Sequence, residues 1–144
     1  HCEAAKVIKN FGPLADYTLC AAQWAPPLTY KDKWFGSAGQ YAKTFEKHYG
    51  YVPPYQAAES TAAVLVYVDA LQRAGSFESE KVRDAIAATK LETFYGNVKF
   101  DATGKNVAKP MVLRQIQKGK YKVVAPTRWA TGKLIHPRPK WSKR

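Results

Sequence analysis

Cysteine and histidine are scarce in this chain, and their positions do not suit a metal site. The 144 residues include two cysteines, Cys2 and Cys20, and three histidines, His1, His48 and His136. No C-x-x-C pair occurs and the histidines lie far apart, so a zinc site is not expected. Cys20 stands in an apolar run, which favours a buried free thiol. Pairing with Cys2 stays open, because a sequence does not place the two Cα atoms.

The sequence also lacks the motifs of common enzymes. It contains no G-x-S-x-G, and the glycines at 36–39 are not followed by the Lys-Ser or Lys-Thr of a phosphate-binding loop. Residues 101–104 (DATG) have too few oxygen ligands for a calcium loop and predict a turn instead. We therefore expect a protein that is not an enzyme and that uses no metal or cofactor.

Long apolar runs are absent as well. No stretch approaches the roughly 20 residues that a membrane-spanning helix needs, and the longest apolar stretch, 57–71, is interrupted by Glu59 and Asp69. The start of the chain has no charged segment followed by an apolar one, as a secretory signal would have. A mature or truncated chain would lack that signal too, so its absence excludes little.

Acidic residues are missing from one part of the chain only. Residues 1–101 hold 11 Lys or Arg and 11 Asp or Glu, whereas residues 102–144 hold 12 Lys or Arg and no acid, which accounts for the net charge of +12. A nucleic-acid module usually gathers its basic groups on one helix or stripe. We therefore expect a solvated basic edge. The alternative is a basic interaction module in which residues 102–144 bind nucleic acid or anionic lipid.

Apolar periodicity and helix-stop glycines predict four helices. The expected ranges are 3–10, 37–49, 56–74 and 79–89. Gly50 and Gly75 follow two of them, where glycine commonly ends a helix. Small and apolar residues fill so much of 56–74 that we expect most of its circumference to be buried.

Four short segments read as strands, and turn residues separate them. The expected ranges are 15–23, 98–100, 111–117 and 121–124. Adjacent prolines make 24–28 a turn or crossing segment, residues 118–120 (KGK) predict a hairpin turn, and the chain from Pro126 should run extended. The fold class is therefore α/β. A single strand ahead of the helices leaves the sheet incomplete, so either chain that is not present here or a second copy, by dimerisation or swapping, would complete it.

Four stretches in register resemble the leucine/branched-chain amino-acid-binding family of periplasmic binding proteins. They are the strand at 16–20 running into 23–26, the helix and loop at 37–53, the long helix at 55–75, and the run 93–126 (TFYGNVKFDATGKNVAKP…). The resemblance implies a type I architecture, with two three-layer α/β/α lobes joined by crossing segments. A small solute would bind between the lobes, and the closed form would be recognised by the membrane permease of an ABC transporter.

The same resemblance implies a division of the chain and a location. Residues 1–24 would form the end of one lobe and a crossing strand, 25–108 the helical part of the other lobe with a short hairpin, and 109–144 the return strands and a basic extended tail. The Ser, Thr and backbone donors that usually hold the ligand carboxylate would lie upstream of His1. The location would be periplasmic or otherwise extracytoplasmic. A sensor on the same fold is a further alternative.

A solute cleft needs aromatic walls and a few fixed polar groups, which selects five candidate ligand-binding residues. Trp24 and Tyr30 flank the double proline. Their rings would either stack on a ligand or pack within the protein. Tyr55 and Gln56 begin the long helix, which in the family starts at the cleft, and Glu59 lies one turn further. Glu59 would contact a ligand ammonium or hydroxyl, or else face water.

These residues favour a branched-chain or aromatic amino acid, or an aromatic acid, as the solute. The three aromatic candidates tilt the expectation towards an aromatic ligand. Phe94 and Tyr95, ahead of Gly96, form a further aromatic step, for which we expect a place in the core.

Overall fold

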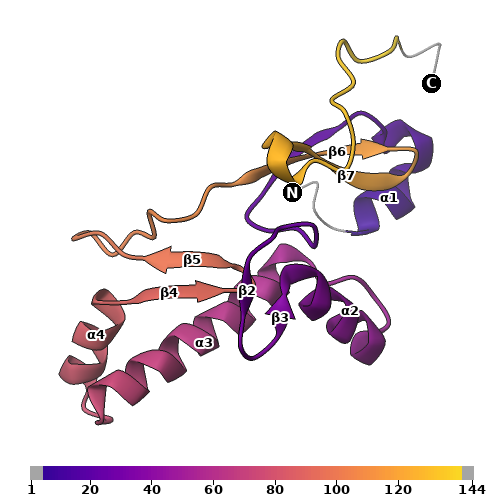
Figure 1. The fold of residues 1–144 in the computed structure, drawn as a ribbon. Helices are drawn as coiled ribbons and strands as arrows, with labels where there is room; N and C mark the ends of the chain where they lie inside the picture. Colours follow the sequence, from indigo (N-terminus) through magenta and orange to yellow (C-terminus); the bar gives the residue numbers. More distant parts are fainter. Residues whose placement is uncertain (1–4, 141–144) are drawn as a thin grey trace.

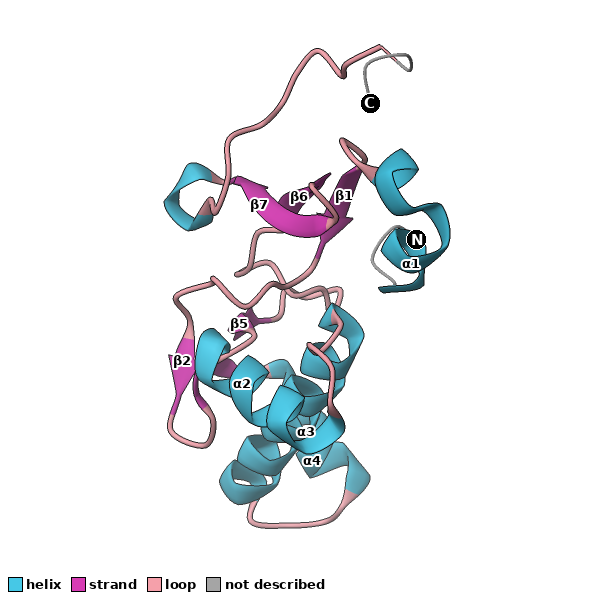
Figure 2. Cartoon of the chain, turned by 90° about the vertical axis from the view of Figure 1, so that its right-hand side faces the viewer, coloured by secondary structure: helices cyan, strands magenta, loops and turns pink. Residues whose placement is uncertain are grey.

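The computed structural model describes residues 5–140 and consists of two bodies that lie side by side (Figure 1). One body is a small antiparallel sheet with a short helix, and the other is a group of three helices with two hairpins. The connections 23–30 and 100–111 join them, so the chain passes twice through the junction (Figure 2). The division into residues 1–24, 25–108 and 109–144 stays a prediction.

The sheet body contains strands β1 (Leu19–Ala22), β6 (Val112–Gln117) and β7 (Lys120–Ala125), in the order β1-β6-β7. Lys118 and Gly119 both have positive φ, 51° and 67°, which suits a tight hairpin turn and confirms the predicted turn. Helix α1 (Ala5–Phe11) precedes the sheet, and a 3-10 turn (Gly12–Ala15) joins them.

The helical body contains α2 (Ala38–Tyr49), α3 (Tyr55–Ala74) and α4 (Ser79–Ala87). The Ser37 hydroxyl accepts the Gln40 backbone N–H while the Gln40 side chain accepts the Ser37 N–H, which fixes the start of α2. Gly50 and Gly75 adopt the left-handed conformation directly after α2 and α3, which confirms both predicted helix ends.

Two hairpins accompany these helices. The first joins β2 (Lys31–Asp32) to β3 (Gly36–Ser37), and the second joins β4 (Lys90–Thr93) to β5 (Gly96–Lys99). The sequence did not predict β2, β3 or β4. The turn predicted at 101–104 is confirmed, since the Asp101 carboxylate accepts the backbone N–H groups of Thr103 and Lys105.

Aromatic rings form the centre of the helical body. Phe94 is fully buried and stacks on Tyr41 with 3.9 Å between ring centroids. Phe35 and Trp24 meet Phe94 edge-on, at 5.4 Å and 6.3 Å. Such geometry adds favourable quadrupole interactions to the burial of large apolar surfaces. The predicted core position of Phe94 is confirmed, and so is that of Tyr95, which is 8% exposed.

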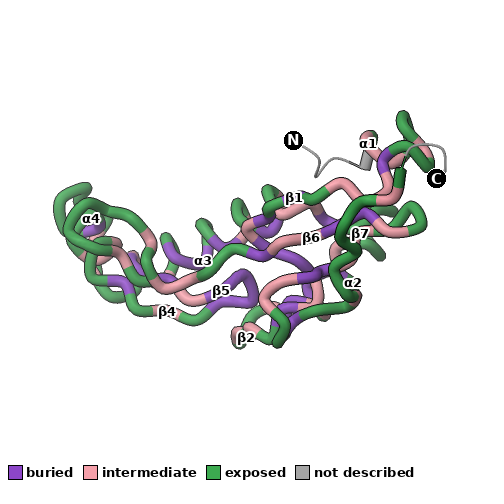
Figure 3. Tube along the Cα trace, turned by 90° about the horizontal axis from the view of Figure 1, so that it is seen from above, coloured by how far each residue is buried: buried purple, intermediate pink, exposed green. Residues whose placement is uncertain are grey.

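Three expectations of local structure are wrong. The strand predicted at 15–23 is shorter, because Tyr17 has a φ of 69° that no strand accommodates. Helix α3 does not bury most of its circumference: Val64 and Tyr67 are exposed on its outer face, and buried and exposed positions alternate along it (Figure 3). Cys20 is disulfide-bonded and therefore not a free thiol. Cys2, the other cysteine of the sequence, lies outside the described residues.

Candidate functional site

The turn of the β4–β5 hairpin points two neighbouring aromatic side chains in different directions. The Thr93 hydroxyl sets this turn, because it accepts the backbone N–H groups of Tyr95 and Gly96 at 3.3 Å and donates to the Gly96 carbonyl at 2.9 Å. The Phe94 N–H donates to the Asp32 carboxylate at 2.7 Å. The backbone of the turn at Phe94 and Tyr95 is therefore held from both hairpins.

Two of the predicted site residues gather around Tyr95. Burial raises the pKa of the Tyr95 phenol, and the negative charge of Glu59, a hydrogen bond with that carboxylate and the nearby Tyr55 raise it further. The phenol therefore stays protonated beside the Glu59 carboxylate. Glu59 itself is exposed and Tyr55 is half-buried, so this side of Tyr95 reaches the surface.

Lys109 lies over the face of the Tyr95 ring. Its Nζ stands 4.0 Å from the ring centroid and donates a hydrogen bond to the Gln23 carbonyl oxygen. Burial lowers the pKa of the ammonium to about 8, although the charge of Glu59 acts in the opposite direction. Cation, ring and carboxylate thus form a series from Lys109 through Tyr95 to Glu59.

Gly96 makes room for the Lys109 side chain. A Cβ at this position would lie 2.8 Å from Lys109 Cε and closer still to Cδ. The φ of Gly96, +147°, is also one that residues with a side chain rarely adopt. Both features keep the stem of Lys109 against the hairpin turn.

The remaining predicted site residues lie elsewhere. Trp24 is 1% exposed, inside the core, and its indole N–H donates to the Phe94 carbonyl at 3.2 Å. Tyr30 is half-buried against the Trp129 ring, with 5.3 Å between centroids. Gln56 is exposed at the start of α3. The candidate site that the geometry favours is therefore Tyr55 and Glu59 with two residues that sequence reasoning did not select, Tyr95 and Lys109.

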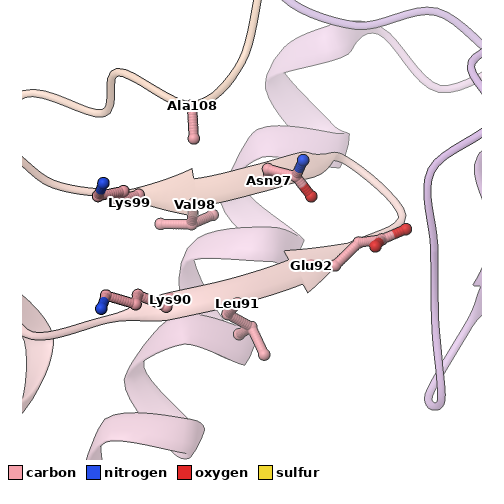
Figure 4. A pocket seen from close by; sticks show the side chains of 7 residues that line it. All are labelled: Lys90, Leu91, Glu92, Asn97, Val98, Lys99 and Ala108. Atoms are coloured by element: carbon pink, nitrogen blue, oxygen red, sulfur yellow. The ribbon is translucent and has the colours of Figure 1, made fainter.

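Cavities also occur away from this cluster. One of about 270 Å³ follows the β4–β5 hairpin, with Lys90 and Lys99 at one end and Glu92 and Asn97 at the other (Figure 4). A larger one, of about 590 Å³, lies between the two bodies and is lined by Pro26, Pro27, Val52 and residues of β7.

Among residues 5–140, none of the helices is both long enough and apolar enough to cross a membrane. No group of three or more His, Cys, Asp or Glu side chains in this part of the chain is placed to hold a metal ion.

The chain belongs to the periplasmic binding protein family, whose profile matches residues 4–120. It is similar in structure to a leucine-binding protein, LivK, from Thermotoga maritima, with a TM-score of 0.74 and 23% identity. That match covers 85% of this chain and 34% of the other.

Two more solved structures extend the comparison. The branched-chain amino acid transporter substrate-binding protein LivJ from Streptococcus pneumoniae, in complex with isoleucine, matches with a TM-score of 0.71 and 20% identity, over 85% of this chain and 35% of that one. A solute-binding protein from R. palustris, in complex with benzoate, matches with a TM-score of 0.64 and 20% identity, over 82% and 32%. The present chain thus spans about a third of the length of these proteins.

The resemblance to branched-chain amino-acid-binding proteins that the sequence predicted is confirmed. The predicted fold class is confirmed too, as α/β material that matches part of the type I periplasmic binding fold.

Proposed function

We propose that this chain is the C-terminal part of the substrate-binding component of an ABC transporter, which captures a small carboxylate-bearing solute in the periplasm. The solute class would be branched-chain or aromatic amino acids, or aromatic acids. The family match and the leucine, isoleucine and benzoate complexes of similar proteins support this class. The partner of the closed form would be a membrane permease.

One observation carries the proposal: Tyr55 and Glu59 lie close enough to Tyr95 to raise the pKa of its phenol, and Lys109 over the Tyr95 ring bonds to Gln23 of the first connection. The group combines an aromatic wall with a carboxylate that is reachable from solvent, which suits a solute with an apolar side chain and a polar end. A solute that contacts both lobes only in the closed form stabilises that form by its differential affinity.

The experiment is a binding screen on the full-length gene product that contains these residues. The proteinogenic L-amino acids, benzoate and hydroxybenzoates would be tested by thermal shift and then by isothermal titration calorimetry. We expect at least one to raise Tm. Tyr55→Ala and Glu59→Ala should each weaken its binding about fivefold or more, because each removes a contact worth about 1–3 kcal/mol.

Gln72→Ala, at an exposed position of the same helix, is the matched control and should leave affinity unchanged. Unchanged affinity in both site variants would remove Tyr55 and Glu59 from the site. If no small carboxylate binds, while DNA or anionic vesicles bind with a steep salt dependence, residues 102–144 would instead act as a basic interaction module.

The homodimer is a separate proposal. Dimerisation or swapping would complete the sheet body of this chain with a second copy. Light scattering on the 144-residue chain is the measurement, and a monomer across the concentration range would contradict it.

A further inference from the structure

Positive charge is divided unequally between the two bodies of the structure. Residues 5–22 and 112–140, which form the sheet body and the segment after β7, hold ten Lys or Arg and one Asp. Residues 23–111, which form the helical body and the connections, hold 11 Lys or Arg and nine Asp or Glu. Most of the net charge of residues 5–140 therefore lies on the smaller body. Helix α1 adds Lys6 and Lys9 to the basic segment that the sequence singled out.

The single acid of residues 5–22 and 112–140, Asp16, serves the backbone. Its carboxylate accepts the Gly119 N–H at 2.9 Å and so holds the β6–β7 turn close to the start of β1. In the helical body, by contrast, Arg73, Lys81 and Arg83 form ion pairs with acids three or four residues away. Ten cations and one acid cannot balance, so the sheet body as a whole attracts anions from outside.

Three segments bring cations to the turn end of the β6–β7 hairpin. The turn itself exposes Lys118 and Lys120. Helix α1 packs against the turn, because a Cβ at its glycine would lie 3.9 Å from Ile8 Cγ2. The segment after β7 returns to the same end, where the Gln117 amide donates to the Lys133 carbonyl at 2.7 Å. The basic surface is defined by four exposed lysines of these segments: Lys9, Lys118, Lys120 and Lys133.

The segment after β7 is fixed on the sheet by two anchors. The Gln115 amide, which is buried, donates to the Ile135 carbonyl at 3.1 Å and accepts the Ile135 N–H at 3.0 Å. The Val123 N–H donates to the Thr131 hydroxyl at 3.0 Å, and the Val123 carbonyl accepts the Thr131 N–H at 2.8 Å. Lys133 lies between these anchors. Because its backbone is already ordered, less conformational entropy is lost when it binds an anion.

Exposed aliphatic side chains accompany these cations and favour a membrane as the partner. Leu134 follows Lys133 directly and is 49% exposed, and Leu14 and Ile135 are exposed as well. Cations that hold lipid phosphates, next to apolar side chains that enter the acyl boundary, are typical of proteins that lie on a membrane surface. Sites for single-stranded nucleic acid present aromatic rings for base stacking instead.

We infer that the basic surface of the sheet body binds a membrane that contains anionic phospholipids. Lys9, Lys118, Lys120 and Lys133 would contact lipid phosphates, and Leu134 would enter the acyl boundary. The inference goes beyond the proposed function and does not depend on the solute. A protein held in this way would reach a membrane permease by diffusion in two dimensions.

The test is co-sedimentation of the full-length gene product with vesicles. One set of vesicles is phosphatidylcholine alone, and the other contains about one third phosphatidylglycerol, each at about 0.05 M and about 0.5 M salt. The sheet-body variant carries four substitutions: Lys9→Gln, Lys118→Gln, Lys120→Gln and Lys133→Gln. The matched control removes the same charge from exposed lysines of the helical body: Lys43→Gln, Lys47→Gln, Lys90→Gln and Lys99→Gln. A third variant has arginine at the four sheet-body positions.

We expect the wild type to bind the anionic vesicles at the lower salt only, and not to bind phosphatidylcholine alone. The sheet-body variant should bind at least about tenfold more weakly, because each cation near an anionic surface strengthens binding by a factor of about five. The control should change by less than about threefold. The arginine variant should bind as the wild type. All variants substitute exposed side chains and should melt as the wild type in circular dichroism.

Equal losses in the sheet-body variant and the control would mean a response to net charge alone and would overturn the inference. Equal binding to both kinds of vesicle would overturn it too. Leu134→Ser should weaken binding to the anionic vesicles about threefold or more and leave binding to DNA unchanged. Unchanged vesicle binding in this variant, or a wild type that prefers DNA to the vesicles, would overturn the choice of a membrane. The solute screen is read separately, so failure of the proposed function leaves this result intact.

Discussion

Phe94 and Tyr95 are neighbours in one turn, yet their surroundings have opposite character. Phe94 is enclosed by the rings of Trp24, Phe35 and Tyr41. Tyr95 lies between an ammonium and a carboxylate, in contact with Lys109 and Glu59. The ring cluster around Phe94 stabilises the helical body, whereas the charged groups around Tyr95 are available to a ligand. A residue of the core, Phe94, and a residue of the candidate site, Tyr95, are thus adjacent in the sequence.

The largest effect on stability is expected from a substitution in the ring cluster around Phe94. Phe94→Ala should lower the free energy of unfolding by about 3–5 kcal/mol, because it empties a filled aromatic site. Urea unfolding followed by circular dichroism measures this. Phe77→Ala is the control, since Phe77 is 89% exposed and its removal should change stability by no more than about 0.5 kcal/mol. Equal losses in the two variants would contradict the assignment of the core.

A smaller effect on stability is expected at Gly96, where the Lys109 side chain packs closely against the hairpin turn. Gly96→Ala should destabilise the fold by about 1–3 kcal/mol, because the new Cβ would overlap the Lys109 stem and the backbone is unsuited to it. In Gly104→Ala the new Cβ meets nothing within 4 Å, and only the φ of +79° opposes it. That control should cost about 1 kcal/mol. A larger loss in the control would mean that Lys109 does not occupy the space at Gly96.

A further effect is a dependence of stability on pH. The pKa of Lys109 is lowered to about 8 from 10.5, so above pH 8 the folded chain releases a proton that the unfolded chain still holds. The free energy of unfolding should therefore rise between about pH 8 and pH 10, and Lys109→Met should remove that rise. Above pH 10 the sign reverses, because Tyr95 has a raised pKa and keeps its proton when folded. A flat wild-type curve from pH 8 to pH 10 would contradict the burial of the lysine charge.

Local signals predicted the helices well. Gly50 and Gly75 mark the ends of α2 and α3, and Lys118-Gly119 marks the β6–β7 turn, because each uses a left-handed conformation that glycine adopts readily. Strand β4 was missed, since its four residues KLET include a single apolar side chain and three of them are not buried. Its pairing with β5 gives it its conformation.

The candidate site was predicted in part. The position of Tyr55 and Glu59 at the start of the long helix indicated them, and the structure places both at Tyr95. Lys109 gave no signal, because it is one lysine in a basic segment and its burial depends on Gly96 and Gln23, which are distant in sequence. Trp24 was proposed for the cleft from its place beside the double proline of the crossing segment, and the structure encloses it in the core.

The pairing of β1 with β6 joins Ala22 directly to Val112. Everything between these residues, including the three long helices and both hairpins, therefore enters and leaves the sheet body at one place, as an inserted domain does. Closing so long a loop carries a large entropic cost while the intervening chain is unfolded, and that cost falls once the insert is compact. We therefore expect residues 23–111 to fold first. The β1–β6 ladder should form late, after this inserted segment has become compact.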